Sequence, residues 1–337
     1  MTAIKATTYG QEDQPRVRGP GGLPKGSLKA VLKRCRAGAR NKNLTTLAAA
    51  LTYYGVLAAI PGLIVLFTVL GIFGRQIANG VAHEVNSVAP GSSGHFVQTL
   101  LTQARSHATG TGILAIVGAV IALWSASSYV SSFRQAANII YEVPEGRPAW
   151  KTIPVRLAVT AAAVVLLVLG GAIVVLSGSI ANAIGNALGA GHTVIDIWEI
   201  AKWPVLFLLA VTLVAMLFWV SPNAKPTGVR WVTPGGLVAA TIWLVASALF
   251  AVYVTDFSSY SKDYGPLAGL VIFLVWLWLS NVALLLGLEV NAELDHERAV
   301  VMGAPEEARP FVELRDTRKL SDAEKRAAVE AEELRRK

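Results

Sequence analysis

The sequence predicts an all-α membrane protein with six transmembrane helices, cytoplasmic N- and C-termini, and short amphipathic segments on the outer face. Three observations lead to this fold class. Of 337 residues, 53% are hydrophobic and only 15% are charged, whereas soluble domains carry about 25% charged residues. The charges divide the chain into long uncharged runs, and Lys and Arg are distributed very unevenly between alternating connecting segments.

The uncharged runs define the predicted spans. Crossing about 30 Å of hydrocarbon takes roughly 20 apolar residues in a helix. Six runs meet this length, namely 43–74, 106–133, 157–195, 203–224, 231–255 and 264–288. A seventh run, 85–104, is excluded because its many Asn, Ser and Gln side chains would lack hydrogen-bond partners in lipid.

Two apolar segments outside these spans predict a cap on the outer face. The run 157–195 is too long for one upright helix, so we expect a span over about 157–179 and an interfacial segment after it. In the segment 76–110, Phe96, Leu100 and Ala104 recur at i, i+4 and i+8, which indicates a weakly amphipathic helix.

The distribution of Lys and Arg predicts the orientation. Four segments, 1–42, 134–156, 225–230 and 289–337, together hold 26 of the 30 basic residues, and the segments between them hold four. Because cytoplasmic loops of membrane proteins carry the excess of Lys and Arg, both termini are expected in the cytoplasm. The chain is therefore predicted to be a multi-pass membrane protein with both termini on the cytoplasmic side.

The predicted organisation is a basic cytoplasmic segment 1–42, a membrane domain 43–295 and a charged cytoplasmic tail 296–337. Residues 28–42 read as a helix with six basic side chains, and each contributes about 1 kcal/mol of attraction to an anionic membrane surface. This helix either docks on the anionic inner leaflet or serves only as a solvated topology signal. Topology already accounts for the net charge of +8, so no nucleic-acid partner is expected.

Both ends of the last span carry further expectations. Glu289 and Glu293 share a helix face, and Glu289 follows 25 uncharged residues, so it is expected to emerge at the cytoplasmic surface. Farther on, Ser321 and Glu324 have the spacing of a capping box that opens a short charged helix. The segment has almost no apolar stripe, which predicts a solvated or disordered tail.

Two features inside the spans are candidates for a substrate path or hinge. Pro61 lies near the middle of the first span, where it predicts either a mobile hinge or a static kink. Ser125, Ser128, Ser132 and Gln135 lie on one helix face. This polar stripe either lines a water-filled cavity or hydrogen-bonds between helices.

The outer loop 256–265 is the candidate for contact with a polar head group. It combines opposite charges with aromatic side chains at a membrane boundary, in Asp256, Tyr260, Lys262, Asp263 and Tyr264. The alternative is that these charges pair with one another and the tyrosines anchor the loop at the interface.

The sequence offers little material for enzyme chemistry. Cys35 is the only cysteine, and the five histidines are scattered, so no metal site, cofactor site or catalytic residue is assigned. We expect no enzyme activity.

Four blocks in order resemble the YihY/virulence factor BrkB family of bacterial inner-membrane proteins. They are "LAAALTYYGVLAAIPGLIVL" at 47–66, "ALWSASSYVSSFRQAANIIYEVPEGRPAWK" at 122–151, and the blocks 221–254 and 257–294. The resemblance covers roughly 44–295 and implies six spans, a multi-pass protein of the bacterial plasma (inner) membrane, and an envelope role. The family once carried the label ribonuclease BN, which we reject here because a metal-dependent nuclease needs clustered ligands.

Two functions remain open. The first is transport or flipping of an amphiphilic, lipid-like envelope component. The second is a scaffold for envelope assembly that transports nothing. The spans contain no charged residue at midplane, which argues against ion-coupled solute uptake. Membrane lipids are the expected partners, and the oligomeric state is left open, a homo-oligomer included.

Overall fold

The computed structural model describes residues 22–24, 26–72, 112–175, 192–225, 229–256 and 266–336. Within these ranges every regular element is an α-helix, and the single backbone bridge joins Ala224 to Leu314. The helices are α1 (Ser27–Asn41), α2 (Leu44–Ile72), α5 (Gly112–Ile140), α6 (Ala149–Val175), α8 (His192–Val220), α9 (Val229–Asp256), α11 (Pro266–Val301) and α12 (Asp322–Arg336). The all-helical class is confirmed for the described part of the chain.

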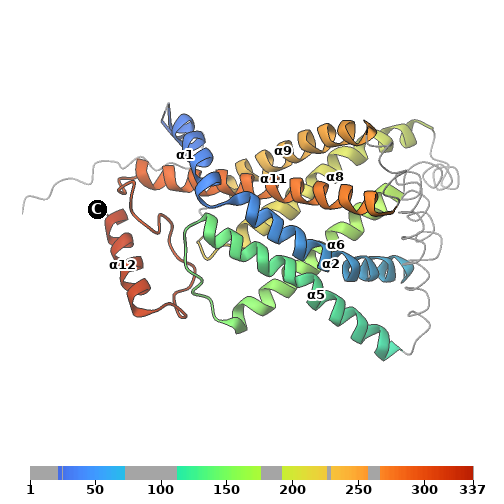
Figure 1. Cartoon of the computed structure of the whole chain (residues 1–337), viewed down its shortest axis with the longest axis horizontal. Coiled ribbons are helices and arrows are strands. Elements are labelled where there is room, and N and C mark those ends of the chain that lie inside the picture. The colour runs from blue at the N-terminus through green and yellow to red at the C-terminus, as the bar shows by residue number, and fades with distance from the viewer. Residues whose placement is uncertain are drawn as a thin grey trace, which may run out of the picture.

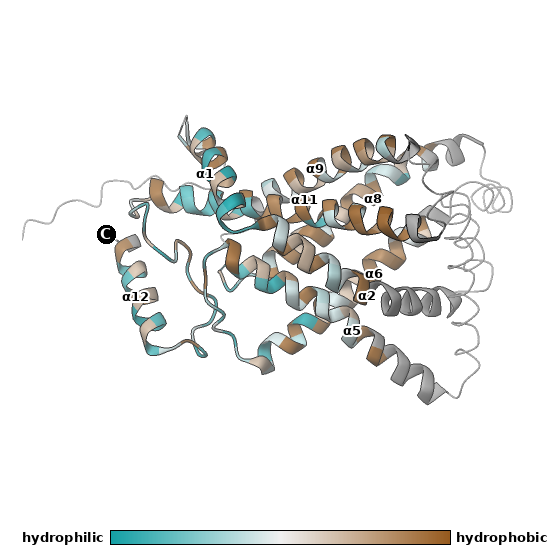
Figure 2. Ribbon diagram, in the orientation of Figure 1, coloured by the Kyte–Doolittle hydropathy of each residue, from teal (hydrophilic) through white to brown (hydrophobic). Residues whose placement is uncertain are grey.

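The six long helices form an elongated bundle (Figure 1). Each packs against two neighbours in the closed order α11, α2, α5, α6, α8, α9 and back to α11. The two short terminal helices, α1 and α12, lie at the same end of the bundle. We call this end the polar end, because hydrophilic residues gather there while apolar residues dominate the long helices away from it (Figure 2).

Four of the long helices are long and apolar enough to cross a membrane. They contain the stretches Ala149–Ile173, Ile200–Val220, Pro234–Tyr253 and Leu270–Val301, and among the fully described residues α2 adds the shorter apolar stretch Leu44–Ala58. Large apolar side chains on these helices point outward, and Leu208, Leu249 and Val252 are each more than 60% exposed. Such surfaces are stable against lipid and not against water.

Small residues bring α9 and α11 into close contact in the polar half. A Cβ atom on Gly235 would clash with the Asn291 side chain and the Gly287 carbonyl, and one on Gly287 would clash with Ala239. The backbone N–H of Gly235 donates to Asn291 Oδ1 at 2.8 Å. Close backbone approach through glycine is a common way to pack helices in membranes, where dispersion and hydrogen bonds replace the hydrophobic driving force.

The packed core lies at the polar end. Its fully buried side chains include Leu51, Phe133, Ile140, Leu285 and Leu288. The helix α11 has 36 residues, which corresponds to about 54 Å at 1.5 Å per residue. It therefore runs well past the hydrocarbon thickness, and its last three turns lie among the polar-end elements.

Part of the tail after α11 is buried, which corrects the expectation of a solvated or disordered tail for residues 303–321, whereas α12 is largely exposed. Residues 303–321, which we call the docked segment, bury Phe311, Leu314 and Leu320. The ring of Phe311 stacks on Tyr141 and on His296. The sequence pattern missed this because the apolar residues here follow neither helical nor strand periodicity, and only their tertiary partners reveal them.

The capping box that opens α12 is confirmed. The Ser321 N–H donates to Glu324 Oε2 at 2.8 Å, and the Glu324 N–H donates back to Ser321 Oγ at 3.3 Å. Two backbone donors at the helix start are thereby satisfied. Several predicted features lie outside the described residues, namely the outer segment 76–110, the interfacial segment after 175, and the loop 257–265.

Candidate functional site

The described structure shows the polar stripe of α5 but does not test the predicted path or hinge. The side chains of Ser125, Ser128 and Ser132 are half-buried, and Gln135 is exposed. The Ser128 hydroxyl donates to the Ser125 carbonyl of the same helix at 2.6 Å. Pro61 lies within the continuous helix α2, but its side chain is outside the described part. The hinge and the stripe stay predictions.

The loop proposed as a head-group contact also remains a prediction. Asp256 is the last residue of α9. Tyr260, Lys262, Asp263 and Tyr264 lie outside the described residues. The structure instead draws attention to a different group of charges, at the polar end.

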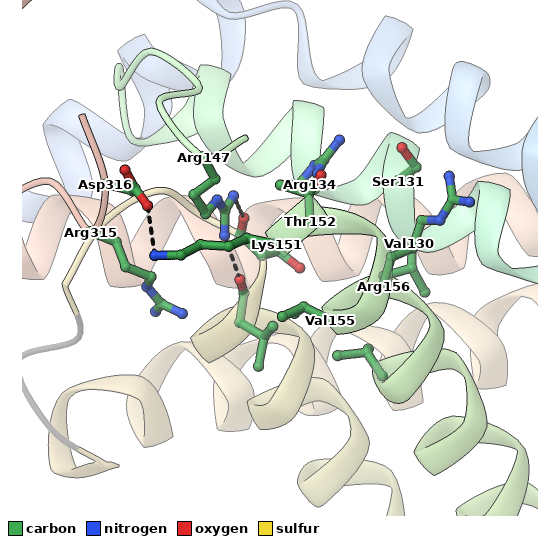
Figure 3. Close-up of a pocket in the computed structure, with 13 residues that line it drawn as sticks. Val130, Ser131, Arg134, Arg147, Lys151, Thr152, Val155, Arg156, Arg315 and Asp316 are labelled. Carbon is green, nitrogen blue, oxygen red and sulfur yellow. Dashed lines mark hydrogen bonds and ion pairs between the residues drawn. The ribbon is translucent and has the colours of Figure 1, made fainter. Parts of the chain in front are cut away.

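A cavity of about 180 Å³ opens at the polar end between α5, α6 and the docked segment. We call it the basic pocket, because five cationic side chains line it together with one carboxylate (Figure 3). The cations are Arg134, Arg147, Lys151, Arg156 and Arg315, and the carboxylate is Asp316. Val130, Val155, Val159 and Val220 form an apolar wall. The pocket can therefore accept a group that is anionic on one side and apolar on the other.

Two of the five cations are neutralised within the protein. Arg147 forms a two-pronged pair with Glu145, at 2.8 Å from Nε to Oε1 and 2.9 Å from Nη2 to Oε2. Burial alone would raise the pKa of Glu145, but the hydrogen bonds and charge of Arg147 outweigh it and hold that pKa below its ordinary value. Arg147 also donates to the carbonyls of Val220 and Ser221. It is a structural residue that holds the loops together.

Lys151 is paired in the same way. Its ammonium lies 2.9 Å from Asp316 Oδ2, and Arg318 lies 2.7 Å from the same oxygen. Hydrogen bonds from Arg318 and Lys151 hold the pKa of Asp316 well below its ordinary value. Asp316 is thus a carboxylate at every physiological pH and anchors the docked segment to α6.

Arg156 and Arg315 have no such compensation. Within the described residues neither guanidinium forms an ion pair with a carboxylate. Arg156 lies over the ring of Trp124 at 4.7 Å, and Arg315 donates to the carbonyls of Ala224 and Trp219. Burial and the nearby charge of Arg147 lower the pKa of Arg315 below its ordinary value, so its surroundings disfavour a positive charge. The guanidinium nevertheless stays protonated.

Residues that line the pocket also hold buried polar atoms that have no hydrogen-bond partner among the described residues. They are Arg134 Nε, Arg156 Nε and Ser221 Oγ. Arg134 Nε lies 3.5 Å from Glu145 Oε2 without a hydrogen bond. Leaving a buried donor unpaired costs about 1–3 kcal/mol, so three such atoms around one cavity point to a ligand that pairs with them.

Asn223 assembles the walls of the pocket. It is fully buried, and its amide nitrogen donates to the carbonyls of Pro144 and Asp316, each at 2.9 Å. Its Oδ1 accepts the Asp316 N–H at 3.1 Å, and its own N–H donates to Asn138 Oδ1 at 2.8 Å. The Asn223 side chain therefore joins the loop after α5 to the docked segment, and its backbone N–H adds a bond to α5.

A second charged cluster joins α1 to α11. Arg34 pairs with Glu293 at 2.8 Å and with Glu297, and Lys42 pairs with Glu289 at 3.0 Å. Glu289 is fully buried, so the expectation that it emerges at the surface is wrong. The helix α1 covers it, and Lys42 supplies the charge that makes burial tolerable. Cys35 lies near the same ion pairs. Burial and the charges of Glu289 and Glu293 raise the pKa of its thiol to about 12.

From the sequence alone, the basic residues of the pocket were interpreted only as evidence for the orientation of the chain in the membrane. A local signal existed, because four of them fall within 134–156, where Glu142 and Glu145 are the only acidic residues. Arg315 had no such signal, since its place in the pocket depends on the docking of a segment 159 residues beyond Arg156 along the chain.

The fold and its polar end define a multi-pass α-helical membrane protein in which both terminal helices lie at one end. The chain belongs to the virulence factor BrkB family, whose model matches residues 36–310. The resemblance seen in the sequence is thereby confirmed.

Relatives place the chain among bacterial membrane proteins. YfkH of Bacillus subtilis (strain 168), ribonuclease-like by name, is 30% identical over 253 residues, which are 74% of this chain and 89% of that protein. A UPF0761 membrane protein of Aeromonas salmonicida (strain A449) is 28% identical over 266 residues, which are 77% of this chain and 88% of that protein. No solved structure matches the chain.

Proposed function

We propose that this protein binds an anionic amphiphile at the cytoplasmic leaflet and moves it across the membrane, without enzyme chemistry. The observation that carries the proposal is the basic pocket, in which uncompensated guanidinium groups face an apolar wall of valines. The exposed rings of Trp124, Trp150 and Trp219 lie in the same elements, and tryptophans mark the head-group level of a bilayer. A lipid-like molecule presents its charge at this depth.

The proposal includes six spans with the polar end in the cytoplasm. The support is the 26-to-4 distribution of Lys and Arg, which the positive-inside rule translates into this orientation. A reporter active only in the cytoplasm should work when fused after Lys337 and fail when inserted within 84–95. The reverse pattern would overturn the orientation.

In this orientation the outer face of α1 meets the inner leaflet. Arg34 and Lys42 turn toward α11, whereas Lys29, Lys33, Arg36 and Arg40 are exposed. Leu28 and Leu32 are exposed beside them, which is typical of a helix that lies in an anionic interface. A fluorophore on Leu32→Cys, in a Cys35→Ser background, should shift to the blue in nanodiscs with phosphatidylglycerol but not with phosphatidylcholine alone, and equal spectra would count against docking.

Transport is tested in proteoliposomes with fluorescently labelled phosphatidylglycerol. Dithionite added outside reduces and so bleaches the label in the outer leaflet. When the full chain is present, the bleached fraction should exceed the fraction of label in that leaflet. Arg156→Gln should slow this movement, because it removes an unpaired cation of the pocket. Arg326→Gln changes the net charge equally on the exposed face of α12 and should leave the movement unchanged. Bleaching confined to the outer leaflet with every variant would contradict transport.

The scaffold function is the second candidate, and a specific observation favours it. Both terminal segments are held to the bundle by ion pairs, by the buried pair Lys42–Glu289 for α1 and by the partly exposed pair Lys151–Asp316 for the docked segment. Terminal segments that are held in place in this way are expected of a rigid scaffold protein. Complementation of a deletion strain by a chain that moves no lipid in proteoliposomes would favour this function.

A further inference from the structure

We propose that the basic pocket binds a phosphate group, with Arg134, Arg156 and Ser221 as its donors and Arg315 as an additional charge. This inference names the ligand of the pocket on which the proposed function rests. Binding itself does not require movement across the bilayer, so the two proposals can fail separately.

The charge balance of the pocket requires an anion. Five cations line it, and two carboxylates, Glu145 and Asp316, pair with members of this set. Three positive charges are left over, on elements that also bury apolar side chains. Charges that are partly removed from water are costly unless a counter-charge is present. A bound anion supplies the counter-charge that the described residues lack.

The unpaired donors indicate where the anion lies. Ser221 is 2% exposed, yet its hydroxyl has no partner among the described residues. Arg156 Nε is likewise buried without a partner, and its guanidinium is held by Trp124 on one face. In Figure 3, Arg134 and Arg156 lie at one end of the pocket, with Lys151, Arg315 and Asp316 at the other. The unpaired arginine donors therefore lie at the end away from the Lys151–Asp316 pair.

The number and origin of these donors favour phosphate over carboxylate. They come from three walls of the pocket, formed by α5, α6 and the loop after α8, so the ligand needs an acceptor toward each wall. A phosphate offers three or four acceptor oxygens in a tetrahedral arrangement, and guanidinium groups match its oxygens in pairs. A carboxylate has two oxygens in one plane and would leave one wall unpaired. The volume of about 180 Å³ holds a phosphate with a small substituent, since one water takes about 30 Å³ of liquid volume.

Two sources carry this group, a phospholipid and a soluble phosphate ester. The experiment uses the purified full-length protein in a neutral detergent and follows thermal unfolding through its nine tryptophans. One arm titrates glycerol 3-phosphate against glycerol at constant ionic strength. The other titrates phosphatidic acid against diacylglycerol. Because a ligand of the native state raises the unfolding midpoint by mass action, the phosphate compounds should raise it and their phosphate-free partners should not.

The variants make the assignment specific. Arg156→Gln should weaken the apparent affinity for phosphate about tenfold or more, as expected for a charged hydrogen bond, while Arg326→Gln should bind like the wild type. Ser221→Ala should weaken binding about threefold and should not lower the midpoint without ligand, because it deletes an unpaired donor. If Arg156→Gln does not fold, Ser221→Ala carries the test.

Each outcome decides the proposal. A rise of the midpoint with both phosphate compounds shows that the phosphate group suffices for binding. A rise with phosphatidic acid alone identifies a lipid head group. Either result supports the site. The proposal is wrong if phosphate compounds and their phosphate-free partners act alike, or if the folded variants bind as tightly as the wild type. Binding without lipid movement in proteoliposomes would remove the transport function and leave the phosphate site.

Discussion

Gly235→Ala should destabilise the protein by about 1–3 kcal/mol, the usual cost of overfilling a packed contact. The added methyl group would clash with the Asn291 side chain and the Gly287 carbonyl, so α9 and α11 must separate. Separation would also break the 2.8 Å hydrogen bond from Gly235 N–H to Asn291. The measurement is the unfolding midpoint in detergent, followed as the loss of monodisperse protein after heating.

The neighbouring glycine provides a matched control. A Cβ on Gly236 meets nothing within 4 Å, and alanine favours a helix over glycine by up to about 1 kcal/mol. Gly236→Ala should therefore leave the midpoint unchanged or raise it. Gly287→Ala, on the opposite side of the contact, should lower it like Gly235→Ala. Equal midpoints for the variants at 235 and 236 would show that the crossing is not as tight as described.

Asn223→Ala should release the docked segment from the bundle. The substitution leaves the carbonyls of Pro144 and Asp316 and the N–H of Asp316 buried without partners. At about 1–3 kcal/mol for each unpaired group, the summed cost reaches several kcal/mol, enough to favour local undocking over an intact but unsatisfied wall. Trypsin should then cut rapidly after Arg315, which in the wild type is half-buried next to the buried Asp316.

A control for this prediction removes an exposed amide at the same end. Asn41→Ala, at the end of α1, should leave the trypsin pattern of the wild type unchanged. Since Arg315 lines the basic pocket from the docked segment, Asn223→Ala should also weaken phosphate binding. A docked segment that stays protected in Asn223→Ala would show that the ion pair of Lys151 with Asp316 holds it without the asparagine.

The predictions that succeeded depend on local patterns. The helix expected over 28–42 is present as α1, and the capping box at Ser321 forms as expected. Helical capping and amphipathicity are decided by residues within one or two turns, which a single sequence displays directly. Membership of the family also followed from short ordered blocks.

The predictions that failed depend on distant partners. Glu289 was expected at the surface, but Lys42, 247 positions away, reaches it in the interior. The docked segment was expected in solvent, but Asn223 and Tyr141 hold it. A charged or irregular stretch looks the same in sequence whether it faces water or a partner. The basic pocket went unnoticed for this reason.

The sequence by itself determined that this is a helical membrane protein of the BrkB family, because the cost of charge in lipid confines charged residues to the ends of long apolar helices. Only the tertiary structure decided which of those end charges are compensated. Within the described residues, Arg147 and Lys151 pair with carboxylates, whereas Arg156 and Arg315 do not. That difference arises from packing between segments far apart in the chain, and it is what turns a topology signal into a candidate binding site.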